Sequence, residues 1–104
     1  RIAHLVVYPE EIQENVQDYM ELTSQYGISK IRTPDRLYGL TLQDAGLAGA
    51  REKYGVAVLA LRRGHDLVLT PDPEERLQAG DILVVAGKDE TIARLMARTK
   101  AAKE

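Results

Sequence analysis

Cysteine, tryptophan and phenylalanine are all absent from the 104 residues of this chain. Without cysteine the chain forms neither disulfides nor thiolate sites, so a reducing compartment is permitted. The longest uninterrupted apolar run, residues 56–61, is far shorter than the roughly 20 residues that a membrane-spanning helix needs. The formal net charge of −2 argues against a broad electrostatic hold on nucleic acid or on an anionic membrane. The length fits one domain with a small core.

The motifs of common enzymes are also missing. No G-x-G-x-x-G follows an apolar run, and no phosphate-binding loop ends in Lys-Ser or Lys-Thr. Ser24 and Ser29 lie outside any nucleophile elbow. The sequence therefore proposes no reaction, and we expect a protein that is not an enzyme.

Metal ligands are equally sparse. The two histidines, His4 and His65, are about sixty positions apart, and neither has a carboxylate at metal-ligand spacing. An acidic cluster in a proline-rich loop offers oxygen ligands for a hard cation, but a solvated loop is the simpler interpretation; its members are Asp72, Glu74 and Glu75. No metal site is predicted.

The segment from Gly55 to Gly87 carries the most informative pattern. Three apolar runs of strand length are separated by turn residues, with Arg62, Arg63 and Gly64 between the first two. Short apolar runs bounded by Gly, Pro and Asp are typical of buried strands. The Gly-Asp pair at positions 80 and 81 predicts a tight turn before the last run.

The remaining segments predict three helices and two more strands. Residues 2–8 read as a strand or as the tail of an upstream segment. Residues 10–20 read as an amphipathic helix with apolar positions at 12, 16, 19 and 20. A short strand is predicted over residues 28–32. Thr41 with Asp44 resembles a capping box and predicts a helix to about residue 52. The last helix is predicted to begin at Asp89, with Ile92, Leu95 and Met96 on one face. The fold class is α+β, with a small mixed sheet and flanking helices.

Several elements in a fixed order resemble the RCK C-terminal domain, also called TrkA-C. The resemblance covers residues 20–95 and rests on the order and spacing of six elements: Gly39-x-Thr41-Leu42, Gly55-Val56, Arg62-Arg63-Gly64, Pro71, Leu77-x-x-Gly80-Asp81 and Val85-Ala86-Gly87. It implies homodimeric regulatory domains attached to bacterial potassium channels, potassium-uptake systems or cation/proton antiporters. It also implies a place in the cytoplasm, associated with an inner-membrane transporter.

The resemblance further implies an effector bound in the dimer cleft, cyclic di-AMP in several branches. Arg62 and Arg63 are the expected phosphate ligands, because a two-fold axis would double them to four guanidinium groups. The alternative interpretation is a solvated basic turn. The resemblance also implies that Ala57, Val58 and Pro71 contact the bases and that His65 reaches a phosphate or a base edge. By residue type alone, Ala57 and Val58 are core strand residues and His65 is an exposed turn histidine. No resident cofactor is expected.

The chain begins at Arg1 rather than at methionine, which indicates a piece of a longer protein. We expect residues 1–19 to link to an upstream segment, residues 20–98 to form the TrkA-C-like domain and residues 99–104 to form a charged tail. The predicted function is ligand sensing for a potassium or other monovalent-cation transport system, with a channel or transporter subunit as partner. Two alternatives stay open: a ligand-free dimerisation module, and a small unrelated enzyme or binding protein.

Overall fold

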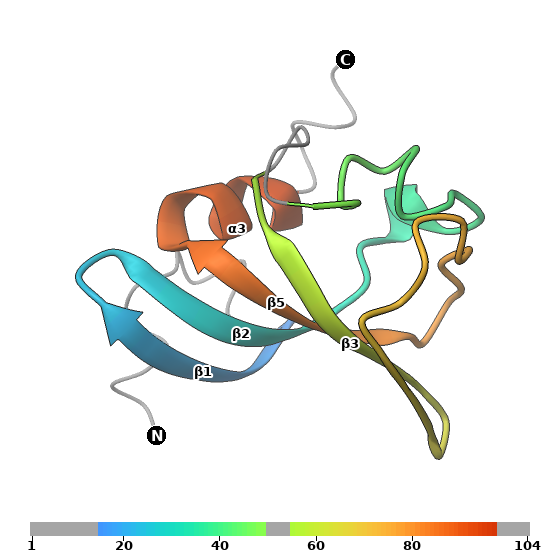
Figure 1. Cartoon of the computed structure of the whole chain (residues 1–104), viewed down its shortest axis with the longest axis horizontal. Helices are drawn as coiled ribbons and strands as arrows, with labels where there is room; N and C mark the ends of the chain where they lie inside the picture. Colours follow the sequence, from blue (N-terminus) through green and yellow to red (C-terminus); the bar gives the residue numbers. More distant parts are fainter. Residues whose placement is uncertain (1–14, 50–54, 98–104) are drawn as a thin grey trace.

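The computed structural model of the chain describes residues 15–49 and 55–97. Within them, α3 lies across one face of a twisted five-stranded sheet (Figure 1). The elements are β1 Val16–Thr23, β2 Tyr26–Arg32, the 3-10 turn η1 Asp35–Leu37, β3 Ala57–Arg63, β4 Asp66–Leu69, β5 Ile82–Lys88 and α3 Asp89–Met96. The α+β class is confirmed, as are the three strands of the Gly55–Gly87 segment, the strand over residues 28–32 and the last helix. Ile92, Leu95 and Met96 of that helix are buried as predicted.

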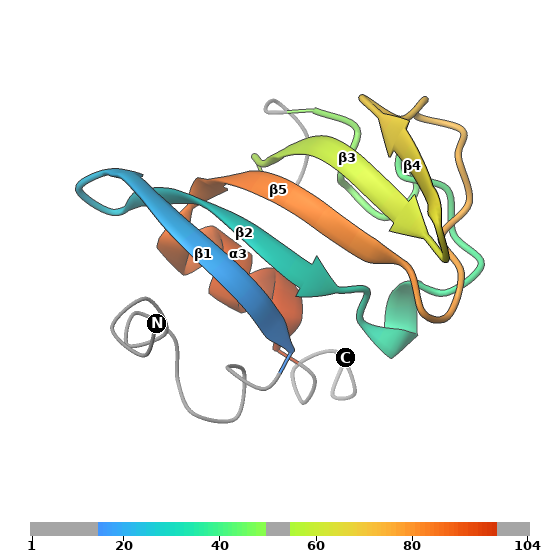
Figure 2. The same ribbon diagram turned by 90° about the horizontal axis from the view of Figure 1, so that it is seen from below.

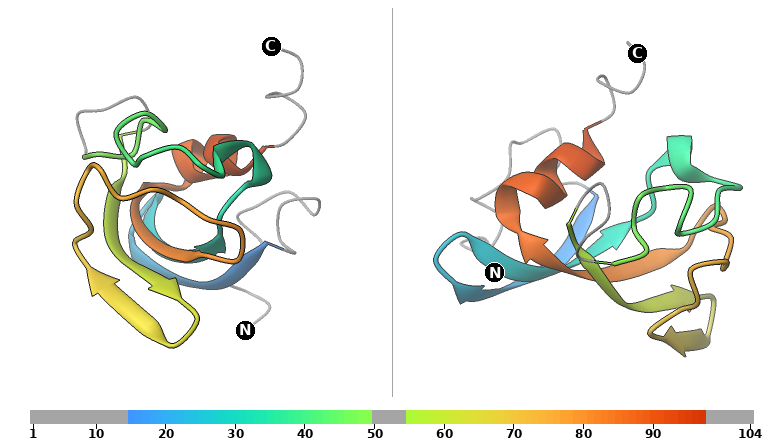
Figure 3. Two further views of the ribbon diagram at one scale, coloured as in Figure 1. Left: turned by 90° about the vertical axis from the view of Figure 1, so that its right-hand side faces the viewer. Right: turned by 45° about the horizontal axis from the view of Figure 1, so that its top comes forward.

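The strand order is β1-β2-β5-β3-β4, so the last strand of the chain lies in the middle of the sheet (Figure 2). Each of the four pairings among the described strands is antiparallel, which refines the expectation of a mixed sheet. Two hairpins, β1–β2 and β3–β4, flank β5 on opposite sides. The sheet curls along this order, and Figure 3 shows β4 curving away from β1.

The predicted helix over residues 10–20 is wrong in its described part, since Val16 to Met20 belong to β1. Val16 and Tyr19 are buried, three positions apart, which is a helical spacing. A register shift between Val16 and Asp18 explains this spacing, because an extra residue in one strand breaks the two-residue alternation. The bulge therefore imitates helical periodicity in the sequence.

The predicted helix from Thr41 is also wrong as far as it is described, although its first turn forms. The Asp44 N–H donates to Thr41 Oγ1 at 3.0 Å, the predicted cap. Two further bonds close the turn at once, from the Leu47 N–H to the Leu42 carbonyl and from the Gly46 N–H to the Gln43 carbonyl. This pair is a Schellman arrangement, and Gly46 takes the left-handed backbone it requires, with φ 81°. The helix thus ends after one turn.

The core lies between the sheet and the layer formed by α3 and the loops. Its buried apolar residues come from all of these: Val16, Tyr19, Ile31, Leu37, Leu42, Ala45, Leu47, Val56, Leu61, Leu77, Leu83, Val85, Ile92, Leu95 and Met96. Gly27 and Gly87 face each other across β2 and β5 beneath this layer. A Cβ on Gly27 would meet the Tyr19 ring, and one on Gly87 would lie 2.8 Å from Val56 Cγ1. Because the two glycines lack side chains, Tyr19 and Val56 can pack directly against the backbone of β2 and β5.

Several predicted segments lie outside the described residues: the strand over 2–8, the first part of the helix over 10–20, the end of the helix over 41–52, and the tail over 99–104. Among the residues that the structure describes, no helix has the length and apolar character needed to cross a membrane.

Candidate functional site

Arg63, at the end of β3, is held by bonds within the chain. Its Nε and Nη2 donate to the two carboxylate oxygens of Asp81 at 2.9 and 2.8 Å. Nη1 donates to Glu75 Oε2 at 3.1 Å and Nη2 to the Arg76 carbonyl at 2.9 Å. Bidentate pairs of this kind are strong and directional. The bonds to Asp81 raise the pKa of the Arg63 guanidinium above its ordinary value, with Glu75 adding to the effect.

Asp81 joins three parts of the fold at this point. Its side chain is 1% exposed and also accepts the Gln78 N–H at 2.8 Å, which closes the turn before β5. Its carbonyl accepts both the N–H and the hydroxyl of Thr33, just after β2. The Gly-Asp turn predicted from the sequence is therefore present. It fixes the loop before β5 to the ends of β2 and β3.

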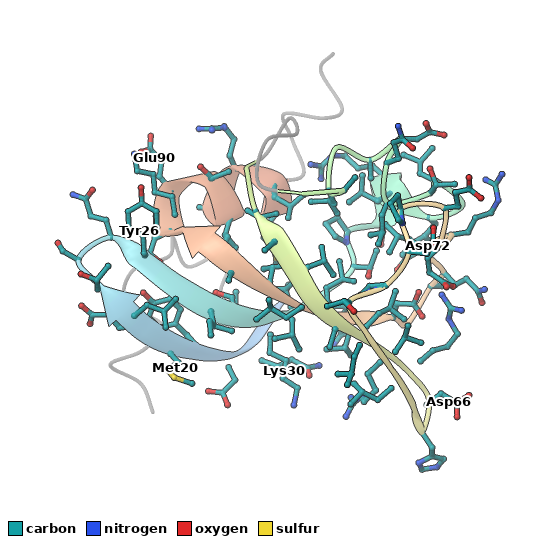
Figure 4. The ribbon with its side chains drawn as sticks, viewed as in Figure 1. Met20, Tyr26, Lys30, Asp66, Asp72 and Glu90 are labelled. Atoms are coloured by element: carbon teal, nitrogen blue, oxygen red, sulfur yellow. The ribbon has the colours of Figure 1, made fainter. Side chains whose placement is uncertain are left out.

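The face of the sheet opposite α3 presents a different surface, which we call the open face. Directly paired residues point to the same side of a sheet, so the register assigns its members. Figure 2 views the sheet from this side with α3 behind, and Figure 4 shows Met20 and Lys30 on the side away from α3. The open face comprises three rows across the strands: Met20, Ile28, Ala86 and Ala57; Asp18, Lys30, Val84, Ala60 and Leu69; and Arg32, Ile82, Arg62 and Leu67.

The six residues proposed from the sequence do not all come together. Ala57 and Arg62 share the open face, Ala57 half-buried and Arg62 exposed. Val58 and Arg63 belong to the opposite side, where Val58 packs against the core and Arg63 reaches Asp81. His65 is exposed in the two-residue turn between β3 and β4, and half-buried Pro71 follows β4. Within one chain, Arg62 and Arg63 therefore lie on opposite faces of the sheet.

The open face also exposes large apolar side chains. Met20 is 57% exposed at one side of the sheet, while Leu67 and Leu69 on β4 are 59% and 68% exposed. Between them, Ala60 and Ile82 are buried although neither belongs to the main core. Met20 lies at the β1 edge, whereas Leu67 and Leu69 lie two positions apart on the β4 edge. Neighbouring exposed apolar side chains such as these two leucines are typical of a contact surface.

The acidic loop has a structural explanation. The Glu74 N–H donates to Asp72 Oδ1 at 3.0 Å, and Glu75 pairs with Arg63. Across residues 15–49 and 55–97, no group of three or more potential ligands is arranged to hold a metal ion. His4 lies outside the described residues.

Two basic residues of the open face, Lys30 and Arg32, were missed from the sequence. The alternation along β2 does give a signal, because Ile28, Lys30 and Arg32 fall at every second position. It places them on one face of a strand. The sequence gives no sign that β5 lies between β2 and β3, and only that strand order brings Arg32 into the same row as Arg62.

The described residues define a small α+β domain built on one antiparallel sheet, with a partly basic face that no other described element covers. The chain belongs to the TrkA-C domain family, whose model matches residues 28–100.

Two potassium-uptake proteins support this membership. The chain is 36% identical over 98 residues to the Ktr system potassium uptake protein C of Bacillus subtilis (strain 168), covering 94% of this chain and 41% of that protein. It is 32% identical over 81 residues to the Ktr system potassium uptake protein A of the same organism, covering 78% and 35%. The chain thus spans less than half the length of either relative.

Among solved structures, it is similar to the Regulator of Conductance of K+ (RCK) C domain of the potassium transport protein KtrA in complex with cyclic di-AMP. The two share 27% identity with a TM-score of 0.63, covering 72% of this chain and 85% of that one.

Proposed function

We propose that this chain is a ligand-sensing regulatory domain of a transport system for potassium or another monovalent cation. Two copies would form a homodimer in the cytoplasm, attached to a channel or transporter subunit in the inner membrane, and bind cyclic di-AMP between them. The single observation that carries the proposal is the likeness to an RCK C domain solved with that ligand. The names of the two Ktr relatives support potassium as the transported ion.

Two residues of the open face support the proposal. Arg62 is exposed there, with no acidic partner among the described residues, and guanidinium forks suit phosphate oxygens. Ala57 lies on the same face and offers an apolar contact for a base. Val58, Arg63, His65 and Pro71 complete the residues proposed from the sequence, with Arg63 assigned here to hold the loop before β5 rather than to contact phosphate.

Regulation would follow from differential affinity. An effector that prefers one mutual orientation of two copies shifts their equilibrium, and a tenfold preference supplies about 1.4 kcal/mol. That is enough to change a balanced gate. Neither a chemical reaction nor binding to polymeric nucleic acid forms part of this proposal.

Titration calorimetry tests the proposal. We expect cyclic di-AMP to bind with micromolar affinity and one ligand per two chains. Arg62→Ala should weaken binding by about tenfold or more, since it removes one guanidinium–phosphate contact per copy. Arg94→Ala is the matched control, because it removes an arginine from α3 on the other side of the sheet. One ligand per chain, or no heat at all, would contradict the proposal.

A ligand-free dimerisation module is the second candidate. The exposed Leu67 and Leu69 favour it, because burying them needs a partner but no effector. Sedimentation showing a strong dimer, together with no thermal shift across nucleotides and divalent ions, would select it over the sensor.

A further inference from the structure

The open face is more basic than the chain as a whole. Its ionisable members are three cations and one carboxylate, although the chain has a formal net charge of −2. The cations are Lys30, Arg32 and Arg62, and the carboxylate is Asp18, directly opposite Lys30. Lys30 thus has a carboxylate directly opposite it, whereas Arg32 and Arg62 have none.

Arg32 and Arg62 lie in one row, on either side of Ile82. Arg32 pairs with Ile82 across β2 and β5, and Arg62 pairs with the same residue across β5 and β3. Two strand spacings separate their Cα atoms by about 10 Å. Long arginine side chains from those positions can converge over the residue between them. Ile82 is apolar and only 6% exposed, so the surface between the two arginines is apolar.

Neither guanidinium is neutralised among the described residues. Arg63 is paired with Glu75 and Asp81, whereas neither Arg32 nor Arg62 has an ion pair with another described residue. Arg32 and Arg62 are both exposed. Two cations held in one row without a carboxylate repel each other, and an anion between them would relieve that repulsion.

We propose that Arg32 and Arg62 form a binding site for a phosphate or phosphodiester group over Ile82 on the open face. A phosphate presents several oxygens, which allows one fork from each side to pair with it. Lys30 lies one row away from Arg32 on β2, where Asp18 directly opposite offsets its charge, so the two arginines carry the proposal. The identity of the ligand as cyclic di-AMP rests on the proposed function, whereas the arginine pair does not. The sequence predicted Arg62 and Arg63 as the two phosphate ligands. Because Arg63 is bonded to Asp81, this proposal assigns the second of those roles to Arg32.

The experiment uses the full chain and two probes, cyclic di-AMP and inorganic phosphate. Amide resonances are followed by NMR and affinities by calorimetry, for the wild type, Arg32→Gln, Arg62→Gln and Arg94→Gln. The expected result is a shift of the amides of Arg32, Ile82 and Arg62. Arg32→Gln and Arg62→Gln should each weaken binding about tenfold, and Arg94→Gln should change it less than twofold. Thermal melting checks that every variant folds.

The outcomes separate this site from the proposed function. If cyclic di-AMP binds and Arg32→Gln binds it as well as the wild type, the site is overturned while the sensor stands. If only inorganic phosphate shifts these amides, and Arg32→Gln abolishes the shift, the site stands and cyclic di-AMP falls as effector. An equal loss in Arg94→Gln, or no shift with either probe, overturns the site.

Discussion

Arg63→Met should lower the free energy of unfolding by about 3 kcal/mol, because it leaves the buried carboxylate of Asp81 without its charged partner. Breaking a buried ion pair from one side costs about 3–5 kcal/mol, and solvent screening at the third of Arg63 that meets water keeps the loss at the lower end. The remaining bond to Asp81, from the Gln78 N–H, is too weak to compensate. Urea unfolding followed by circular dichroism measures the loss.

The neighbouring arginine provides the control. Arg62→Met makes the same change one residue earlier, on the open face, where no acidic partner lies among the described residues. Its stability should stay within about 0.5 kcal/mol of the wild type, as is usual for surface substitutions. Equal losses in the two variants would show that the pairing with Asp81 contributes nothing specific.

Gly87→Ala should destabilise the fold by about 2 kcal/mol, because the new Cβ would lie 2.8 Å from Val56 Cγ1 and 3.4 Å from Val56 Cα. Val56 is fully buried and cannot move aside without disturbing the core. The shift required of the backbone adds to the cost. Thermal and urea unfolding should both report the loss.

Gly49→Ala is the matched control for this substitution. A Cβ at Gly49 would meet no atom within 4 Å, and its φ is not in the left-handed region. The change should be neutral or slightly stabilising, because alanine restricts the unfolded chain. If Gly87→Ala proved as harmless as Gly49→Ala, Val56 would not pack as closely against β5 as the structure shows.

The strands of this fold could be predicted where local chemistry decides them. The runs that became β3, β4 and β5 are short, apolar and bounded by turn residues, and the last helix begins with acids. β1 could not be predicted, because its bulge gives Val16 and Tyr19 the spacing of a helix. The turn at Thr41 was predicted at its start, but a Schellman closure at Gly46 depends on contacts that a capping pattern does not reveal.

The site was predictable only in part. The sequence identifies Arg62 and Arg63 as adjacent cations, and strand alternation alone would separate them onto opposite faces. Only the folded loop before β5 places the buried carboxylate of Asp81 on the Arg63 side of the sheet, and the sequence does not show this. Arg32 lies thirty positions from Arg62 in the sequence, and only the central place of β5 brings them into one row.

The place of β5 also constrains how the chain assembles during synthesis. The two hairpins emerge from the ribosome first, and isolated two-stranded hairpins are marginally stable in water. β2 and β3 each pair with β5 in the finished sheet, so neither hairpin can join the sheet until residues 82–88 have been translated. Co-translational folding should therefore occur late and in one step, and a nascent chain stalled before β5 should be readily digested by proteases.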